Sequence, residues 1–440
     1  MTGYIIAFLY FLLFLYVFKK SRFFRDISGL TYPWLLFFFS LKVVSGIFLS
    51  LIYKHYYEPE TADIYKYFND GLYLYKILWK SPVDFLHIIT GIGISQEHVD
   101  LYLSNLSYWF RPWESPIYND NRVVIRFNAL ACLFSFGHLH VHTVFANLVS
   151  FTGLVALYKF FLNYMPGNRV KLLKWGVFLF PSLLFWGSGV LKEAILIGCF
   201  GVAVYLADEF IRNKKLYWPK VALFFICLWV LVLLKPYILI LFLPCIAGFY
   251  VSRNMSFLRE QLVYISLFAG AIVMAFLIHL VIPEYSPIYL MSRKHNDLIN
   301  LALAVDAGSL LHLNYLKPEF FDILSKAPKG FITTLIRPHI LEADTAFMLL
   351  AAVENLLILL LILAAIVMPS GLKKQSPLTF LSFWFCLAGF TFIGLTTPLA
   401  GAIVRYKILM LPFLWVCILN MFNDRIIKIV SLPNNQISNY

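Results

Sequence analysis

Long apolar stretches alternate with short polar connections along nearly the whole chain. A helix needs about 20 mostly apolar residues to cross a bilayer, and somewhat fewer where flanking side chains reach the headgroups. The stretches that meet this description are 3–18, 32–53, 140–164, 175–186, 190–206, 221–234, 237–251, 262–282, 346–368, 378–395 and 408–421. We therefore predict an all-α, polytopic membrane helix bundle with about 11 transmembrane helices, forming a single transmembrane domain over residues 1–440.

Positive charge falls on every second connection between these stretches. The basic connections are 19–30, 165–174, 208–220, 252–261, 369–377 and the tail after residue 421. They hold 17 Lys and Arg residues, whereas the short connections on the other side hold 4. Because cytoplasmic connections are enriched in Lys and Arg, this alternation predicts that the N-terminus is outside and the C-terminus inside.

Two long connections, 54–139 and 283–345, are then predicted on the outer side of the membrane. The first is rich in Tyr and Trp, which favours helices lying on the bilayer surface over a solvated linker. We expect such interfacial helices at 72–79 and 85–92. Proline also interrupts several apolar stretches, at Pro181, Pro236, Pro244 and Pro412. In a bilayer these breaks survive where protein or a water-filled cavity satisfies the freed backbone groups, so they indicate a polar cavity.

The composition indicates a chain surrounded mostly by lipid. Apolar residues make up 61% of it, charged residues make up 13%, and the mean hydropathy is +0.78, which excludes a water-facing surface over most of its length. The net charge of +13 resides in the connections, so we expect no nucleic-acid partner. All six Cys residues lie within apolar stretches without CxxC spacing, which indicates buried thiols and neither a disulfide framework nor a metal site.

The densest group of acids follows the second apolar stretch, in Glu-Pro-Glu-Thr-Ala-Asp-Ile-Tyr-Lys-Tyr-Phe-Asn-Asp-Gly. Its members are Glu58, Glu60, Asp63 and Asp70. If 62–71 is helical, Asp63 and Asp70 share one face, with Tyr67 between them. A carboxylate beside aromatic rings at the membrane interface loses hydration, which raises its pKa toward a value suited to a general base. The alternative is that these acids are solvated loop charges or helix N-caps.

Cations gather at the predicted outer ends of the apolar stretches. They are Lys192, Lys235, Arg337, Arg405 and Lys407. A charge within the apolar slab costs roughly 3 kcal/mol and needs a partner. A phosphate group satisfies several cations at once, because Arg donates two parallel hydrogen bonds and Lys supplies a point charge. The alternatives are a structural turn at Lys192 and Glu193, ion pairs with the acids, and side chains that extend to the headgroups.

Two further polar groups lie near or within the apolar stretches. His138, His140 and His142 place two imidazoles four residues apart, but no carboxylate or Cys follows at ligand spacing, so we predict no metal site. Glu354 and Asn355 lie inside the ninth apolar stretch. An acid at that depth is a functional candidate, and the alternative is a polar contact between packed helices.

This layout resembles the GT-C class of bacterial membrane glycosyltransferases, which act in envelope polysaccharide synthesis. The similarity lies in the acidic cluster of the first long outer connection, in Phe-Pro-Ser-Leu-Leu-Phe-Trp-Gly-Ser-Gly-Val-Leu-Lys-Glu at 180–193, and in Gly-Ala-Ile-Val-Arg-Tyr-Lys at 401–407. In contrast to the family, the acidic connection follows the second apolar stretch and lacks an adjacent acidic pair. The resemblance implies a multi-pass protein of the cell inner membrane with its active face on the periplasmic side.

The resemblance also implies an activity, the transfer of a sugar from a polyprenyl-phosphate donor to a glycan, lipid or protein acceptor. It implies a catalytic base at Asp63 or, second, at Asp70, and a carrier phosphate held by the outer cations. Supporting residues would be Glu58, Glu60, Glu193, Tyr67, Tyr406 and Glu354. We expect no cofactor.

Two other activities fit the same pattern. A polymerase or ligase of the O-antigen type would use outer Arg residues on a lipid-pyrophosphate glycan. A transporter or flippase for lipid-linked sugars would bind phosphate with the same cations and make or break no bond. Because the chain shows no internal repeat, an inverted-repeat transporter is disfavoured.

Overall fold

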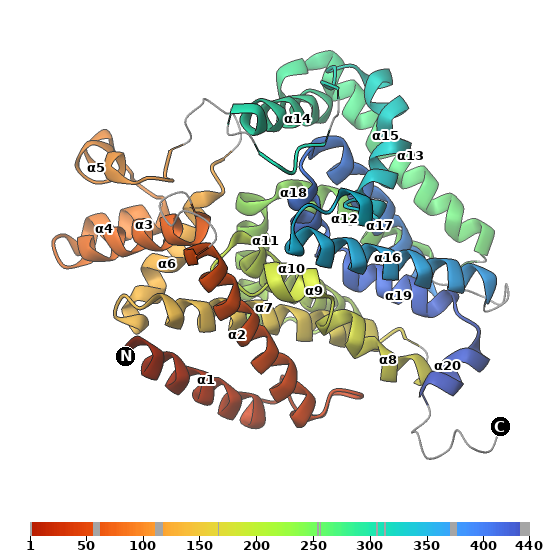
Figure 1. Cartoon of the computed structure of the whole chain (residues 1–440), viewed down its shortest axis with the longest axis horizontal. Helices are drawn as coiled ribbons and strands as arrows, with labels where there is room; N and C mark the ends of the chain where they lie inside the picture. Colours follow the sequence, from red (N-terminus) through yellow and green to blue (C-terminus); the bar gives the residue numbers. More distant parts are fainter. Residues whose placement is uncertain are drawn as a thin grey trace. The chain divides into compact units, whose positions relative to one another are not determined.

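The computed structural model describes residues 2–55, 62–110, 118–165, 167–252, 255, 257–304, 307–311, 314–369 and 376–431. Over these residues the chain is helical, with 20 α-helices, three short 3-10 helices and two isolated β-bridges (Figure 1). It divides into two compact units. Unit 1 comprises Met1–Phe160 and Leu184–Pro236, and unit 2 comprises Phe161–Leu183 and Tyr237–Tyr440.

Unit 1 contains the helices of the first half of the chain. They are α1 (Thr2–Lys20), α2 (Tyr32–His55), α3 (Asp63–Leu78), α4 (Pro82–Thr90), α5 (Gln96–Leu101), η1 (Leu103–Asn105), α6 (Asn121–Ser135), α7 (Leu139–Leu162), α10 (Lys192–Asn213) and α11 (Trp218–Leu234). Helices α3 and α6 pack closely, because Gly71 has no side chain. A Cβ atom there would lie 2.4 Å from the Cβ atom of Asn128.

Unit 2 contains the remaining helices in whole or, for α9 and α12, in part. They are α8 (Gly167–Phe178), α9 (Pro181–Trp186), α12 (Pro236–Ser252), α13 (Phe257–Val281), η2 (Pro283–Tyr285), α14 (Pro287–Ala304), α15 (Phe320–Ile336), η3 (Ile340–Glu342), α16 (Ala346–Val367), α17 (Pro377–Thr396), α18 (Ala400–Lys407), α19 (Leu411–Met421) and α20 (Asp424–Ser431). Both long connections that were predicted outside the membrane are thus largely helical. The expected interfacial helix at 72–79 is the second half of α3, and the one at 85–92 is most of α4.

Seven helices in the described part of the chain are long and apolar enough to cross a membrane. They are α1, α2, α7, α10, α13, α16 and α17. The pair α18 and α19, bent by 69°, makes an eighth if it is one broken span. These helices support the prediction of an all-helical, multi-pass membrane protein. The number of crossings and their direction stay predictions.

Three of the eleven predicted stretches lie outside this set of helices. Helices α11 and α12 are apolar but have 17 residues each, which is short for a span. The stretch 175–186 is not one helix, since α8 ends at Phe178 and α9 begins at Pro181. Proline has no N–H for the helical ladder and disfavours helical backbone in the residue before it, so the helix stops there.

Three glycines bring α7 and α10 into backbone contact. A Cβ atom on Gly201 would lie 2.0 Å from the carbonyl oxygen of Gly153, and one on Gly198 would lie 2.5 Å from Cγ1 of Val149. Small residues at such positions let membrane helices approach closely.

We expect Gly201→Ala to lower the free energy of unfolding by about 1–3 kcal/mol, because the added methyl group forces two packed backbones apart. Thermal unfolding of the full chain in detergent measures the change. Gly270→Ala in α13 is the matched control, because a Cβ atom there would have no heavy atom within 4 Å apart from its chain neighbours and the backbone of its own helix. Equal unfolding temperatures for the two variants would contradict the close approach of α7 and α10.

Candidate functional site

The two aspartates of α3 contact the same residue in unit 1. The Tyr108 hydroxyl donates a hydrogen bond to Oδ1 of Asp63 at 3.2 Å, and the Tyr108 backbone N–H donates to Oδ2 of Asp70 at 2.8 Å. Asp63 is half-buried and Asp70 is buried. The prediction that these acids share one face of a helix is therefore confirmed, with Tyr67 on the same helix between them.

Asp70 holds the chain segment that carries Tyr108. Its second oxygen, Oδ1, accepts the backbone N–H of Ser107 at 3.0 Å, so each carboxylate oxygen accepts a hydrogen bond from the backbone. Burial raises the pKa of Asp70 above its ordinary value, while the two N–H groups and the nearby Lys66 act in the opposite direction. These contacts fit a role in positioning the segment.

The raised pKa of Asp70 predicts a pH dependence of stability. The folded chain binds the Asp70 proton more tightly than the unfolded chain, so proton binding at Asp70 stabilises the fold. This stabilisation is complete below about pH 4 and is lost as pH rises through the higher folded pKa. The unfolding temperature of the wild type relative to Asp70→Asn should therefore fall as the pH is raised above 4. If the unfolding temperature of the wild type relative to Asp70→Asn stays constant or rises across this range, burial does not raise the pKa of Asp70.

Lys192 at the start of α10 meets an acid that precedes α6. Its Nζ atom lies 2.8 Å from Oδ2 of Asp120, and both side chains are less than one-fifth exposed. The same Nζ atom lies 5.9 Å from the centre of the Tyr67 ring, within the range of a cation–π contact. The Tyr67 hydroxyl in turn donates to Oδ1 of Asn121 at 3.0 Å.

A continuous set of contacts joins Asp63 to Lys192. The Tyr108 ring, whose hydroxyl bonds Asp63, lies 5.4 Å from the Tyr67 ring, and Lys192 lies over Tyr67. Lys66 adds a second cation, with Nζ 4.5 Å from the centre of the Tyr108 ring. The arrangement brings a predicted catalytic acid and a predicted phosphate-binding cation into one polar cluster. We call Asp63, Tyr67, Tyr108, Asp120 and Lys192 the α3–α10 cluster.

Glu193, next to Lys192, forms a buried ion pair with the predicted cation Lys235. Oε1 of Glu193 lies 3.2 Å from Nζ of Lys235, and the two side chains are 1% and 9% exposed. Glu193 lies in the first turn of α10, where the helix dipole favours a carboxylate. The pair ties the start of α10 to the end of α11.

The break between α9 and α10 is held by side chains from other helices. Nζ of Lys42, in the middle of α2, donates to the carbonyl oxygen of Gly187 at 2.7 Å and to Oγ of Ser188 at 3.2 Å. Nδ2 of Asn147 in α7 donates to the carbonyl oxygen of Ser188 at 2.8 Å. The freed carbonyl groups are thus satisfied by protein, as a break at membrane depth requires. This support fixes the start of α10 and with it Lys192.

The sequence interpretation missed these supporting residues. Lys42 had a usable signal, because it is a charge in the middle of an apolar stretch and such charges are usually functional. Asp120, Asn121 and Tyr108 had no such signal, since nothing in their local sequence relates them to α3 or α10.

The predicted residues of unit 2 have contacts within that unit. Nε of Arg337 lies 3.2 Å from Oε1 of Glu342, and buried Lys407 donates to Oδ1 of Asn355 at 2.7 Å and to the carbonyl oxygen of Thr334 at 3.1 Å. These contacts give both cations partners inside the protein.

Three other predicted residues, Glu354, Arg405 and Tyr406, also lie in unit 2. Glu354 accepts the backbone N–H and the hydroxyl of Ser182 at 2.7 and 2.6 Å, a polar contact between α16 and α9. Arg405 and Tyr406 lie on α18, where the Tyr406 ring is 5.4 Å from Nζ of Lys294. The two remaining predicted acids, Glu58 and Glu60, lie outside the described residues.

The histidines of 138–142 have ordinary structural contacts. The His142 ring bonds Oδ1 of Asn128 at 2.7 Å and Oγ of Ser135 at 2.6 Å, and His140 stacks on Tyr4. Among the residues that the structure describes, no group of three His, Cys, Asp or Glu side chains is arranged to hold a metal ion.

The fold and these contacts define a multi-pass membrane protein with a polar acid–cation cluster between α3 and α10. Comparison of the chain with protein-family models, with curated proteins and with solved structures found no match.

Proposed function

We propose that this chain is a membrane glycosyltransferase that moves a sugar from a polyprenyl-phosphate donor to a hydroxyl group of a glycan, lipid or protein acceptor. The observation that carries the proposal is the α3–α10 cluster, in which Asp63 and Lys192 are joined through two tyrosines. With the N-terminus outside, this cluster faces the non-cytoplasmic side of the membrane, where lipid-linked sugars are used.

Asp63 is the general base of the proposed reaction. Its carboxylate removes the proton of the acceptor hydroxyl as the hydroxyl oxygen attacks the anomeric carbon of the donor. The bond between that carbon and the phosphate oxygen breaks, and the lipid phosphate leaves with the electron pair. The new glycosidic bond has inverted configuration, and the proton remains on Asp63 until it is released to water.

Lys192 stabilises the leaving phosphate. A cation already held in place lowers the barrier where negative charge develops, because it needs no reorganisation during the reaction. Asp120 holds the ammonium group 2.8 Å away and the Tyr67 ring lies beneath it, so its position is restricted before the donor binds. The phosphate would share Lys192 with Asp120.

Incubation of the purified full chain, in lipid nanodiscs, with radiolabelled polyprenyl-phosphate sugars and a mixture of glycan acceptors tests the proposal. Transfer of label into a glycosidic product is the expected result. Absence of product with every donor, together with movement of the donor across vesicle membranes, would instead identify a transporter. Product formation only from lipid-pyrophosphate glycans would identify a polymerase or ligase.

Substitutions separate the transferase from the polymerase. In a transferase that needs a base, Asp63→Asn should lower turnover by about 10²- to 10⁴-fold. In a polymerase of the O-antigen type, Asp63→Asn should leave most activity, whereas Arg405→Ala or Arg337→Ala should abolish it.

A further inference from the structure

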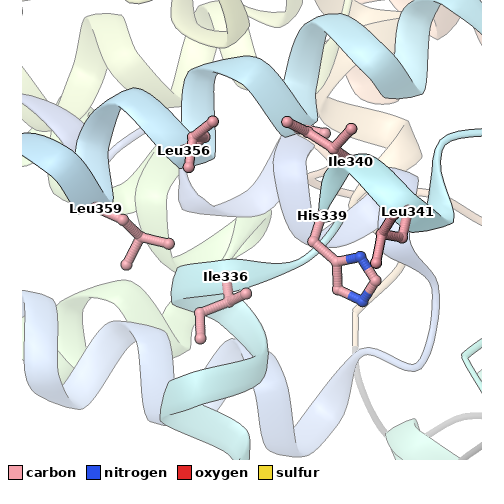
Figure 2. Close-up of a pocket in the computed structure, with 7 residues that line it drawn as sticks. Ile336, His339, Ile340, Leu341, Leu356 and Leu359 are labelled. Carbon is pink, nitrogen blue, oxygen red and sulfur yellow. The ribbon is translucent and has the colours of Figure 1, made fainter.

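Unit 2 contains an apolar cavity of about 310 Å³ between the end of α15, η3 and the middle of α16. Its walls are formed by Ile336, His339, Ile340, Leu341, Ala352, Leu356 and Leu359 (Figure 2). Six of these seven side chains are hydrocarbon, and the volume is at the lower end of the range for small-molecule sites. The cavity can therefore hold an apolar group and offers few hydrogen bonds to a polar one.

Arg337, which follows the lining residue Ile336 in the chain, places a cation beside the cavity. Nε2 of His339, which lines the cavity, lies 3.2 Å from Oε1 of Glu342, and the same oxygen lies 3.2 Å from Nε of Arg337. Glu342 thus holds an imidazole and a guanidinium group next to each other. Both remain more than one-third exposed. Arg337 meets Glu342 through Nε, and the flat fork of a guanidinium group suits a phosphate.

The cavity adjoins a surface that fits the hydrocarbon of a bilayer. Helix α16 is one of the helices long and apolar enough to cross a membrane. Only 28% of its most apolar 18-residue segment is buried within the protein. Leu356 and Ile340, which line the cavity, are 41% and 45% exposed, and Leu341 is 93% exposed. An exposed apolar surface of this kind on a spanning helix contacts lipid, so the cavity continues the lipid-facing surface inward.

We propose that this cavity binds the hydrocarbon chain of a lipid phosphate, whose phosphate group is held at the rim by Arg337. The apolar walls select the chain, and the guanidinium group of Arg337 selects the anionic head. The chain enters sideways from the bilayer along α16. The inference rests on the proposed function in one respect, because the bound lipid belongs to the class that the transferase would use. The phosphate held here is that of a second lipid molecule, distinct from the donor whose phosphate Lys192 stabilises.

Cross-linking with a diazirine-labelled farnesyl phosphate, on the full chain in nanodiscs, tests where the lipid binds. We expect labelled peptides from α15, η3 and α16, and competition by unlabelled farnesyl phosphate. Farnesol, which lacks the phosphate, should compete at least ten-fold less well. Inorganic phosphate at the same concentration should not compete, because it has no chain to fill the cavity.

Substitutions then test the cavity and its rim separately. Leu356→Trp, which fills the cavity, should reduce specific labelling at least ten-fold. Leu357→Trp is the matched control, because Leu357 is 55% exposed on the same helix and does not line the cavity. Arg337→Gln should remove the preference for farnesyl phosphate over farnesol, while the labelled peptides stay the same.

The results that would overturn the inference are distinct from those that would overturn the proposed function. Labelling that is insensitive to Leu356→Trp and to Leu359→Trp means that the lipid does not use this cavity, even if sugar transfer is observed. Equal competition by farnesol and farnesyl phosphate in the wild type means that the rim does not recognise phosphate. Cavity-dependent labelling without any sugar transfer would leave the lipid site in place and overturn the transferase.

Discussion

Replacing Asp63 with Asn should reduce the rate of sugar transfer by about 10²- to 10⁴-fold, the usual contribution of a general base. The amide cannot accept the proton of the acceptor hydroxyl at neutral pH. It keeps the size of the carboxyl group and an oxygen that can accept the Tyr108 hydroxyl, which now bonds Oδ1 at 3.2 Å. The loss should therefore appear in turnover and leave donor binding nearly unchanged.

Two further variants make this result specific. Asp100→Asn changes an exposed acid of α5 in the same connection between α2 and α7, where Oδ1 accepts a hydrogen bond from Gln96, and should leave the rate within two-fold of wild type. Lys192→Met should weaken both donor binding and turnover, because it removes the positive charge that stabilises the donor phosphate. If Asp63→Asn retains more than half of the wild-type rate, Asp63 is not the base.

Replacing Glu193 with Gln should lower the free energy of unfolding by about 3–5 kcal/mol, the usual cost of breaking a buried ion pair. The Glu193 side chain is 1% exposed and its partner Lys235 is 9% exposed, so water cannot replace the lost carboxylate charge. An ammonium group next to a neutral amide in that environment is poorly solvated. Thermal or denaturant unfolding of the full chain in detergent measures the change.

The pair is tested further with a double variant and a surface control. Glu193→Gln combined with Lys235→Met removes both charges, and should recover much of the stability that the single variant loses. Asp322→Asn breaks the i, i+4 pair with Lys326 on α15, whose side chains are 21% and 35% exposed, and should cost about 0–1 kcal/mol. Equal losses for Glu193→Gln and Asp322→Asn would show that burial of the first pair has no energetic consequence.

Local periodicity was sufficient to predict the relation between Asp63 and Asp70. Seven residues are nearly two turns of an α-helix, so any helix through 62–71 places both acids on one face. Hydropathy was likewise sufficient for the long apolar helices, because a helix in lipid must satisfy its backbone groups within itself. The short stretches were harder, since 12 to 17 apolar residues fit either a short span or a buried helix.

The partners of the charged side chains could not be predicted. Lys192 was expected to pair with the acidic cluster or with phosphate, and the structure pairs it with Asp120. Lys235 pairs with Glu193, 42 positions earlier in the chain. Such pairs depend on which helices become neighbours, and the sequence of one helix contains no information on the identity of the helix beside it.

The sequence by itself determined that this protein is helical, rich in lipid-facing surface and supplied with acids and cations near predicted helix ends. These properties follow from hydropathy, residue spacing and charge, which act locally along the chain. Only the tertiary structure decided that Asp63 and Lys192 belong to one cluster, that Lys42 holds the break before α10, and that a cavity beside Arg337 is apolar. Each of these facts depends on contacts between residues far apart in the sequence, and such contacts form when helices pack.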